Sequence, residues 1–306
     1  MMKYSISYIQ FLLLILLFND IWLISSVSYD LPNERPDSFH TMPISVFNKK
    51  FHVGSVHHDW VLHEEFQCLE EVNRALKDKE GQCNVLDVGM NDGFYTQLSA
   101  SYGCRVWSFE LQESCITVSR NAIHVNNFTD LVTIFRSPVS NSHSEVFKVP
   151  RGSDDDVKRC DGGFSISGKD PNQKAHKQFQ VHGHIALHTT KLDSFVPWGT
   201  IIDFMKVDVE GHDVEVLMGA EKLFKEHRIK MALIEVTSEF WGVAVNEGLE
   251  IYKKIIENYG YQVICIGDPA RAPDKNVFRS DLNYESFAGF VKANKCVNWK
   301  FTPSRQ

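Results

Sequence analysis

The chain has 306 residues, of which 43% are hydrophobic and 23% are charged, as in an ordinary globular protein. This length can form one α/β domain of about 200–250 residues together with a separate N-terminal segment. The formal net charge of −7 and the lack of a basic stripe argue against a protein that binds nucleic acids.

The first part of the chain is an apolar segment that predicts a membrane anchor or a signal peptide. Residues 6–27 contain the run Phe11–Phe18 between further apolar residues, and together they are long enough to span a bilayer. Lys3 precedes this run, which favours a cytoplasmic N-terminus and a lumenal main domain in the endoplasmic reticulum or Golgi. The small residues of Ser26–Ser28 suit signal cleavage, so a secreted protein is the alternative. In both cases residues 1–28 direct the rest of the chain into the secretory pathway.

Residues 29–56 contain three prolines and no sustained hydrophobic period, so we expect a stem or linker. The main domain then covers residues 57–300. It begins with residues 57–78, where apolar side chains recur at three- and four-residue steps and predict an amphipathic helix. These side chains are Leu62, Phe66, Leu69, Val72 and Leu76.

Strand and helix patterns alternate through the remainder of this domain, apart from a polar surface insertion at 151–180. The predicted strands are Asn84–Val88, Arg105–Phe109, Val132–Arg136, Ile201–Val207, Met231–Val236, Tyr261–Ile266 and Ser286–Lys292, with an extra strand at Ser144–Val149. The predicted helices are Thr96–Tyr102, Cys115–Asn126, Val214–His227 and Asn246–Tyr259. Strands separated by helices pair in parallel through right-handed crossovers. We therefore expect a Rossmann-like α/β fold, with a seven-stranded, mostly parallel sheet and helices on both faces.

The densest pattern, Cys83–Thr96, predicts a strand, a glycine-rich turn and a helix. The strand ends abruptly at Gly89, and Gly93 closes the turn before helical spacing resumes. Glycine permits positive φ and lets backbone N–H groups approach a ligand closely. The next strand ends in Glu110, about twenty residues after Gly89, where an acid can accept hydrogen bonds from two ribose hydroxyls. Together these features favour a cofactor that contains a nucleoside.

A second dense pattern, Asp203–His212, follows the fourth strand of the predicted sheet. Three side chains at its end, Asp208, Glu210 and His212, should lie in the same crevice as the glycine turn. A structural alternative is that the two acids cap the next helix and complement its dipole. We favour a functional role because two acids and a histidine within five residues of a strand end are unusual on a merely solvated surface.

These two motifs, together with Ile234–Val236, closely resemble the FkbM family of methyltransferases over residues 83–240. The resemblance implies the class I methyltransferase fold and S-adenosylmethionine as cofactor. It assigns cofactor binding to the positions that match the family's first motif and its ribose-binding acid, which are Asp87, Gly89, Asn91, Gly93 and Glu110. Met90 departs from the small residue common in the family. Ser137–Ser140 stands where many methyltransferases place an acid against adenine, so that contact is in question.

FkbM-like enzymes are chiefly O-methyltransferases, and the predicted compartment points to a hydroxyl of a glycan or another secretory-pathway molecule. Removal of the hydroxyl proton requires a base, and histidine is suited to this near neutral pH. The resemblance therefore suggests His212 as proton acceptor, with Asp208 and Glu210 orienting it. We expect no metal site and no nucleic-acid partner, and the oligomeric state cannot be predicted.

Two other functions compete with this interpretation. An N-terminal anchor, a stem and the acids Asp154–Asp156 would also suit a Golgi glycosyltransferase that binds a metal and a nucleotide sugar. Those acids, however, lie in the polar insertion without an apolar strand before them. The second alternative is a methyltransferase-like fold that binds the cofactor without catalysis.

The cysteines and a glycosylation motif bear on the compartment. Cys83, Cys104 and Cys265 lie in or beside apolar strands, where we expect plain core residues. Cys160 and Cys296 lie in polar surroundings and would be able to pair in an oxidising lumen. Asn127–Thr129 is a sequon for N-glycosylation.

Overall fold

The computed structural model describes residues 41–54, 61–62, 65–151, 160, 183–266 and 281–304. The chain divides into two units, Met1–Asp37 and Ser38–Gln306, and every described residue belongs to the second. The predicted N-terminal anchor or signal peptide and the acids Asp154–Asp156 lie outside the described residues. None of the described helices combines the length and the hydrophobicity that a bilayer crossing requires.

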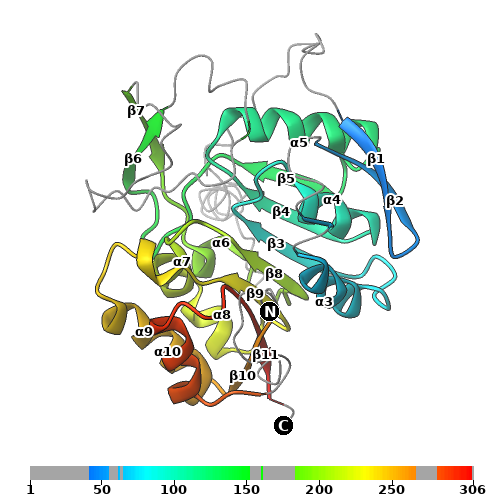
Figure 1. Ribbon diagram of the computed structural model, residues 1–306. Helices are drawn as coiled ribbons and strands as arrows, with labels where there is room; N and C mark the ends of the chain where they lie inside the picture. Colours follow the sequence, from blue (N-terminus) through cyan, green and yellow to red (C-terminus); the bar gives the residue numbers. More distant parts are fainter. Residues whose placement is uncertain are drawn as a thin grey trace, which may run out of the picture. The chain divides into compact units, whose positions relative to one another are not determined.

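The centre of the second unit is a seven-stranded sheet with the order β10-β11-β9-β8-β3-β4-β5 (Figure 1). Five neighbouring strands pair in parallel: β9 (Ala232–Glu235), β8 (Phe204–Val207), β3 (Asn84–Val88), β4 (Arg105–Phe109) and β5 (Val132–Phe135). The strand β11 (Asn298–Pro303) runs antiparallel between β9 and β10 (Tyr261–Cys265). The predicted fold class, a mostly parallel seven-stranded sheet, is confirmed.

Helices cover both faces of this sheet. One face carries α3 (Phe66–Leu76), α4 (Phe94–Ser101) and α5 (Glu113–Val125). The other face carries α6 (Leu192–Phe195), α7 (Asp213–Gly219), α8 (Glu221–Lys225), α9 (Val245–Lys253) and α10 (Tyr284–Lys292). Successive strand residues supply the two cores in turn, so that Val85 packs in the first and Leu86 in the second. Both faces of the central strands are dry, which explains why these strands are apolar almost throughout.

Part of the predicted linker is instead a β-hairpin, so the linker prediction is wrong for residues 41–54. β1 (Thr41–Val46) and β2 (Lys49–Gly54) pair antiparallel around the two turn residues Phe47 and Asn48, both at positive φ. Phe51 and Val53 of β2 are buried in the core formed with α4 and α5. The turn contains no glycine, so the usual sequence signal for a hairpin was missing.

The side chain of Asn126, which follows α5, fastens this hairpin to the domain. Its Oδ1 accepts the backbone N–H of His52 at 2.6 Å, and its Nδ2 donates to the carbonyl of His52 at 2.8 Å. The same Nδ2 also donates to Oε1 of Gln97 in α4 at 2.8 Å. A side-chain amide thus completes the edge of β2 as a neighbouring strand would.

The predicted seventh strand, Ser286–Lys292, is wrong because these residues belong to the helix α10. Asn283 caps this helix, with its Oδ1 accepting the N–H of Ser286 at 2.9 Å. Phe287 and Val291, four residues apart, are both buried. A short apolar run does not distinguish a strand from one buried helix face. The seventh strand is β11, which the sequence analysis missed.

A second hairpin stands apart from the central sheet (Figure 1). β6 (Val146–Arg151), which matches the extra strand predicted from the sequence, pairs antiparallel with β7 (Gly183–His188). The hydroxyl of Ser137, just after β5, donates to the carbonyl of His188 at 2.6 Å. This contact joins the base of the hairpin to the end of β5.

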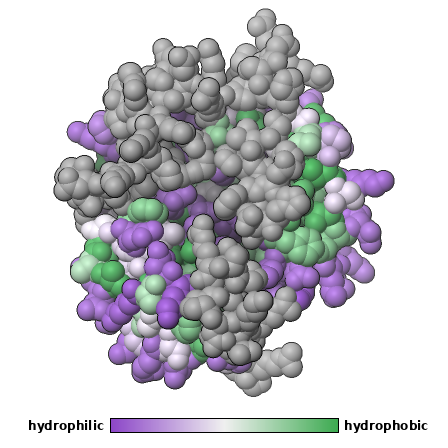
Figure 2. Space-filling model, viewed as in Figure 1, coloured by the Kyte–Doolittle hydropathy of each residue, from purple (hydrophilic) through white to green (hydrophobic). Residues whose placement is uncertain are grey.

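Among the described residues, the large hydrophobic side chains that remain exposed are spread over several parts of the domain. They are Phe66, Val125, Val146, Trp198, Ile201 and Met218. In the view of Figure 2, hydrophilic and hydrophobic residues are mixed over the described surface.

Six of the seven cysteines form disulfides, which corrects two predictions. The pairs are Cys83–Cys104, Cys115–Cys160 and Cys265–Cys296, and Cys68 is a buried free thiol. The suggested pair of Cys160 with Cys296 is therefore wrong, and Cys83, Cys104 and Cys265 are not plain core residues. The first pair follows from strand register, because Cys83 and Cys104 each precede residues that face one another in β3 and β4.

Candidate active site

The site lies where the C-terminal ends of β3 and β8 adjoin. In the order of the sheet, β4 and β5 lie on one side of β3, whereas β8 and β9 lie on the other side of β3. In open α/β sheets, ligands bind in the crevice at such a switch point. Gly89 follows β3 and Asp208 follows β8, and the N–H of Asp208 donates to the carbonyl of Val88 at 2.9 Å. The two sequence motifs therefore meet here, as predicted.

The turn after β3 depends on glycine at two positions. Gly89 has φ +82° and Gly93 has φ +88°, which other residues rarely adopt. A Cβ on Gly89 would lie 1.7 Å from the backbone oxygen of Asp208, and one on Gly93 would lie 2.3 Å from Oγ of Ser119. Both glycines therefore allow unusual backbone conformations and close approach of neighbouring segments. Between them, Asn91 also has positive φ, at 52°.

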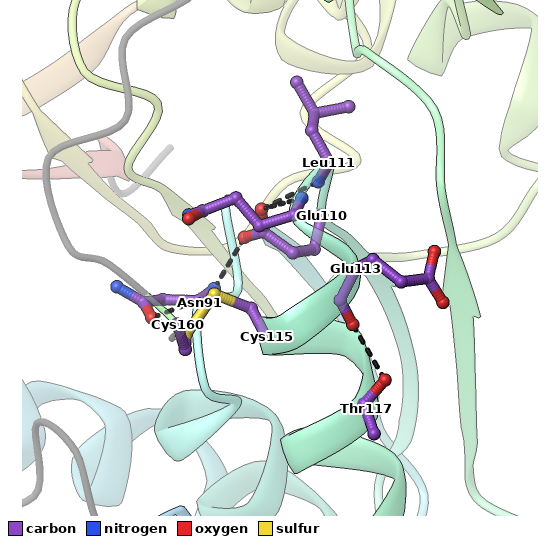
Figure 3. Close-up of a disulfide and its surroundings, with 8 residues drawn as sticks. Asn91, Glu110, Leu111, Glu113, Cys115, Thr117 and Cys160 are labelled. Atoms are coloured by element: carbon purple, nitrogen blue, oxygen red, sulfur yellow. Dashed lines mark hydrogen bonds between the residues drawn. A yellow bond between two sulfur atoms is a disulfide. The ribbon is translucent and has the colours of Figure 1, made fainter. Parts of the chain in front are cut away.

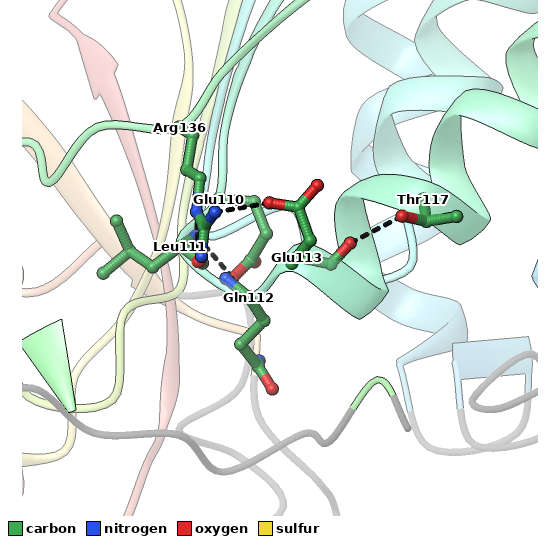
Figure 4. A network of polar contacts seen from close by, with 6 residues as sticks. All are labelled: Glu110, Leu111, Gln112, Glu113, Thr117 and Arg136. Carbon is green, nitrogen blue, oxygen red and sulfur yellow. Dashed lines mark hydrogen bonds and ion pairs between the residues drawn. The ribbon is translucent and has the colours of Figure 1, made fainter. Parts of the chain in front are cut away.

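The carboxylate of Glu110, which follows β4, binds this turn (Figure 3) to its own loop (Figure 4). Its Oε2 accepts the N–H of Asn91 at 2.9 Å, and its Oε1 accepts the N–H groups of Leu111 at 2.7 Å and Gln112 at 2.8 Å. Glu110 is only 7% exposed, and this burial raises its pKa even though the three hydrogen bonds act in the opposite direction. The acid predicted to bind ribose thus stands beside the glycine turn.

Arg136, just after β5, holds the loop on the far side of Glu110. Its Nε donates to the carbonyl of Leu111 at 3.1 Å, and its guanidinium forms an ion pair with Glu113 (Figure 4). The hydroxyl of Thr117 donates to the carbonyl of Glu113 at 2.9 Å. These contacts fix the start of α5 relative to the ends of β4 and β5.

Asp87 lies within β3, behind the turn, and is 1% exposed. Its Oδ2 accepts the hydroxyl of Thr96 at 2.6 Å, and that hydroxyl also contacts Oγ of Ser108 at 2.7 Å. Its Oδ1 is buried without a hydrogen-bond partner among the described residues. Burial raises the pKa of Asp87 to about 6. Direct contact of Asp87 with the cofactor stays a prediction, and its observed contacts position the first turn of α4.

These features fit the cofactor that the motif implies. Gly89 and Gly93 give the turn its positive φ and let Asp208 and Ser119 pack directly against its backbone, which fixes the turn beside Glu110. Glu110 presents a buried carboxylate whose Oε1 already accepts two N–H groups, whereas Oε2 accepts one and keeps a lone pair for a further donor, such as a ribose hydroxyl. S-adenosylmethionine contains such a ribose, and the turn and Glu110 are the residues that would hold it.

A buried ion pair lies at the end of β8, next to the glycine turn. Lys206, in the middle of the apolar strand β8, is 1% exposed, and its Nζ lies 2.8 Å from Oδ2 of Asp208. Asp208 also shares a side-chain hydrogen bond with Glu235, the last residue of β9. Val207 pairs with Ile234 in the sheet, so the following residues Asp208 and Glu235 are neighbours at the strand ends.

The charges in this group determine one another's protonation. Burial, together with the charge of Asp208, raises the pKa of Glu235 well above its usual range. Burial opposes the charged form of Asp208, but the ammonium of Lys206 and the hydrogen bond with Glu235 lower the pKa of Asp208. Burial would lower the pKa of Lys206, but the carboxylates, Asp208 foremost, raise it. These shifts favour the ammonium form of Lys206, the carboxylate form of Asp208 and the protonated form of Glu235.

Lys206 is also covered by aromatic and acidic side chains from the first helical layer. Its Nζ lies 5.0 Å from the centre of the Tyr95 ring in α4, a cation–π contact. The hydroxyl of Tyr95 donates to Oε2 of Glu65 at 2.6 Å, just before α3. The group therefore extends from the crevice to the start of α3.

His212 lies at the N-terminal end of α7 and is buried. Its Nδ1 is 3.5 Å from Oε2 of Glu215, one helical turn further on, and its ring meets that of Phe147 in β6 edge to face at 5.9 Å. Glu215 was not among the residues predicted to orient His212, and the predicted role of Asp208 and Glu210 in orienting it stays a prediction. Glu210 lies in the left-handed conformation with φ 50°.

The loop after β9 holds the second motif in place. The space that a Cβ on Gly211 would need is filled by Phe240, whose Cβ would be 2.5 Å away. Asp213, the first residue of α7, accepts hydrogen bonds from Nε1 of Trp241 at 2.9 Å and from the hydroxyl of Tyr252. Asp213 is fully buried, and burial raises its pKa to about 7. These contacts position the backbone that carries Glu210 and His212.

Three charged residues of the site escaped the sequence analysis. Glu235 ends a parallel strand as Glu110 does, so the same rule would have found it. Lys206 is a charged residue inside an apolar strand, which is itself a signal of function or of a buried partner. Glu215 is three residues after His212, the spacing at which helical side chains meet.

Comparisons with known proteins agree with this geometry. Residues 87–263 match the methyltransferase FkbM domain, which covers more than half of the chain. No curated protein sequence matches the chain. The segment that matches the FkbM domain includes the glycine turn, Glu110, the ion pair of Lys206 with Asp208, and Glu235.

Solved structures with a similar fold are distant. The METTL16 MTase domain is 11% identical with a TM-score of 0.39, covering 78% of this chain and 67% of that one. A putative rRNA-methylase from Clostridium thermocellum is 12% identical with a TM-score of 0.40, covering 78% and 97%. The N-terminal domain of human METTL16 in complex with SAH is 13% identical with a TM-score of 0.35, covering 76% and 67%. Because these identities and TM-scores are low, the family of this chain is assigned from the domain match and the sheet order alone.

The strand order, the glycine turn at the switch point and the domain match agree on one identity, which also defines the cofactor as S-adenosylmethionine. The chain belongs to the FkbM family of methyltransferases.

Proposed function

We propose that this protein transfers the methyl group of S-adenosylmethionine to a hydroxyl of a secretory-pathway acceptor, with a glycan as the acceptor class. The observation that carries the proposal is a histidine–carboxylate pair, His212 with Glu215, directly after the crevice strand of a domain with three disulfides. The pair suits removal of a hydroxyl proton, and the disulfides suit an oxidising compartment.

The proton of the hydroxyl requires an acceptor, whereas the methyl group needs no activation by the protein. The cofactor, when bound, supplies the activated methyl. A neutral imidazole has one donor and one acceptor nitrogen. Because Glu215 lies beside Nδ1 of His212, it favours the tautomer in which Nδ1 carries the proton and Nε2 is basic. His212 is therefore the proposed proton acceptor and Glu215 its positioning residue.

Asp208 has a different proposed role. Its carboxylate is held by Lys206 and Glu235 and directly follows the strand end that faces Gly89. A carboxylate at this point suits the positive charge of the cofactor, which carries a sulfonium and an amino group. The buried Lys206 fixes the position of Asp208 and keeps it ionised. Glu210 has the backbone of a tight turn and remains a candidate for contact with the acceptor.

The disulfides and the N-terminal sequence support the proposed compartment. Three disulfides within one domain are rare in a reducing cytosol and common in secreted and lumenal proteins. The apolar residues 6–27 and the preceding Lys3 support insertion with a cytoplasmic N-terminus. We propose a single-pass protein of the endoplasmic reticulum or Golgi, with secretion after signal cleavage as the alternative.

Transfer of labelled methyl from S-adenosylmethionine is the direct test. The full-length chain would be incubated with separate pools of secretory glycans, glycolipids, proteins and RNA. We expect label in a glycan, released as a methyl ether of a sugar. Label in nitrogen of RNA or protein would contradict O-methylation. Cofactor binding without transfer to any pool would favour the non-catalytic alternative. In a parallel assay with a labelled nucleotide sugar, transfer of the labelled sugar would favour the glycosyltransferase.

A further inference from the structure

The disulfide Cys115–Cys160 touches the turn that holds the cofactor (Figure 3). Sγ of Cys160 lies 2.6 Å from Oδ1 of Asn91, and Sγ of Cys115 lies 3.6 Å from the same atom. A disulfide sulfur carries no proton, so these are close sulfur–oxygen contacts and not hydrogen bonds. Both cysteines are buried, at 0% and 3% exposure, so the contact is shielded from solvent.

Asn91 is the residue of the turn that most needs such support. It adopts φ 52°, a conformation that is unfavourable for residues other than glycine, although asparagine tolerates it better than most. Its backbone N–H donates to Oε2 of Glu110 at 2.9 Å, and its side chain is in contact with the disulfide. The backbone of Asn91 is thus held by Glu110, and its side chain is confined by packing against Cys115–Cys160.

The same disulfide also fastens the segment that follows Glu110. Cys115 is the third residue of α5, close to the loop whose N–H groups bind Glu110. The other two disulfides lie elsewhere. Cys83–Cys104 lies at the N-terminal ends of β3 and β4, whereas Asn91 follows the C-terminal end of β3. Cys265–Cys296 joins the end of β10 to the segment before β11. Only the pair at Asn91 is placed to act on cofactor binding.

We propose that the Cys115–Cys160 disulfide is a positioning element of the cofactor site, so that the chain binds S-adenosylmethionine tightly only when this disulfide is formed. The proposal rests on the cofactor assignment and adds a redox requirement to it. With the disulfide in place, Asn91 and the start of α5 are already ordered before the cofactor arrives. Without it, the competent turn is only fractionally populated, and the apparent affinity falls by that fraction.

The redox step is an ordinary thiol–disulfide exchange. A dithiol reductant breaks the Sγ–Sγ bond of Cys115–Cys160, and each sulfur gains one electron and one proton. The two thiols of the reductant close into their own disulfide, so electrons and protons balance. Re-formation in an oxidising lumen reverses the step.

Two matched double variants of the full-length chain test the proposal by calorimetry with S-adenosylmethionine. Cys115→Ser with Cys160→Ser should bind the cofactor about ten-fold more weakly while keeping its circular dichroism spectrum. Cys83→Ser with Cys104→Ser removes a disulfide far from Asn91 and should lower the melting temperature with wild-type affinity. Equal loss of affinity in both variants would overturn the proposal, because it would reflect general destabilisation.

A double-mutant cycle shows whether the effect passes through Asn91. Asn91→Ala should weaken binding by itself, and adding Cys115→Ser with Cys160→Ser should then cause little further loss. Fully additive losses would overturn the assigned route. If the serine variant does not fold, graded reduction of the wild-type chain replaces it, with the disulfides mapped by mass spectrometry. Affinity should then fall with reduction of Cys115–Cys160, and a fall that follows another disulfide would contradict the proposal.

The wild-type measurement separates this proposal from the cofactor assignment. Wild-type protein that does not bind S-adenosylmethionine would overturn the assignment and the proposal with it. Wild-type binding together with unchanged affinity in the Cys115→Ser and Cys160→Ser variant would overturn the proposal alone.

Discussion

The backbone oxygen of Asp208 occupies the position that a Cβ on Gly89 would require, with only 1.7 Å between them. These residues directly follow β3 and β8, which are neighbours in the middle of the sheet. The cofactor turn and the segment that leads to His212 therefore touch through their backbones, and a change in one displaces the other. This contact explains why glycine is required at this point independently of any ligand.

Gly89→Ala should therefore be strongly destabilising. The substitution adds a clash with backbone to a strained positive φ, so we expect the free energy of unfolding to fall by about 3–5 kcal/mol. Urea unfolding measures this change. Gly289→Ala is the matched control, because Gly289 lies in α10 with open space around it and should be neutral or up to about 1 kcal/mol more stable. Equal stability of Gly89→Ala and wild type would contradict the geometry of the turn.

Glu110→Gln should weaken binding of S-adenosylmethionine by roughly 30-fold or more, since one carboxylate oxygen becomes a donor that faces donors. Isothermal calorimetry measures the affinity. Because burial raises the pKa of Glu110, wild-type affinity should also fall as the pH is lowered through the pKa of this group, and the variant should lack that dependence. Unchanged affinity in Glu110→Gln would remove the ribose assignment.

His212→Ala should slow methyl transfer roughly 10²-fold or more while leaving cofactor affinity nearly unchanged. The wild-type rate should fall at acidic pH as the base is protonated, and the variant should lose this part of the profile. Glu215→Gln should reduce kcat about ten-fold through the orientation of His212, again with intact cofactor binding. Native turnover and an unaltered pH profile in His212→Ala would leave His212 as a residue of the helix start.

Asp213 should make the stability of the domain depend on pH. Its folded pKa of about 7 lies above the value of 3.8 for an unperturbed Asp, so the folded state keeps this proton over a range in which the unfolded state has lost it. The contribution of Asp213 is thus fully present below about pH 4 and is lost as the pH rises toward 7, by at most about 4 kcal/mol.

The measurement is urea unfolding of wild type and Asp213→Asn between pH 4 and 8. Asn keeps an oxygen acceptor for Trp241 and Tyr252 but does not titrate. The difference between the two proteins isolates Asp213 from Asp87, whose raised pKa of about 6 acts in the same direction. Parallel stability curves would show that Asp213 keeps its ordinary pKa.

Asn127 should carry an N-linked glycan if the domain is lumenal. Both Asn127 and Thr129 are exposed just after α5, where a glycan would meet solvent. A mobility shift on endoglycosidase treatment should be present in wild type and absent in Asn127→Gln. A mature N-terminus near Tyr29 would show cleavage of the apolar segment, and a chain that starts before it would show an anchor.

The sequence alone determined the elements whose signals are local. The run before Gly89 and the acid at Glu110 specified a strand, a turn and a second strand end, because backbone freedom and strand polarity are read from neighbouring residues. The parallel sheet followed from the alternation of strands and helices. The resemblance over residues 83–240 then led to the family that the domain match confirms.

Only the tertiary structure decided how distant residues combine. Cys115 and Cys160 pair across 45 residues, and spacing cannot reveal such a pair because the register of separate elements brings the sulfurs together. Likewise the helix at Ser286–Lys292 was misread as a strand, since a short apolar run serves either structure until its packing partners are known. Asp208 meets Lys206 two residues before it in the chain, whereas its contact with Glu235 depends on the register of β8 and β9. Such contacts arise from the sheet as a whole, and they determine which acids in this chain are charged.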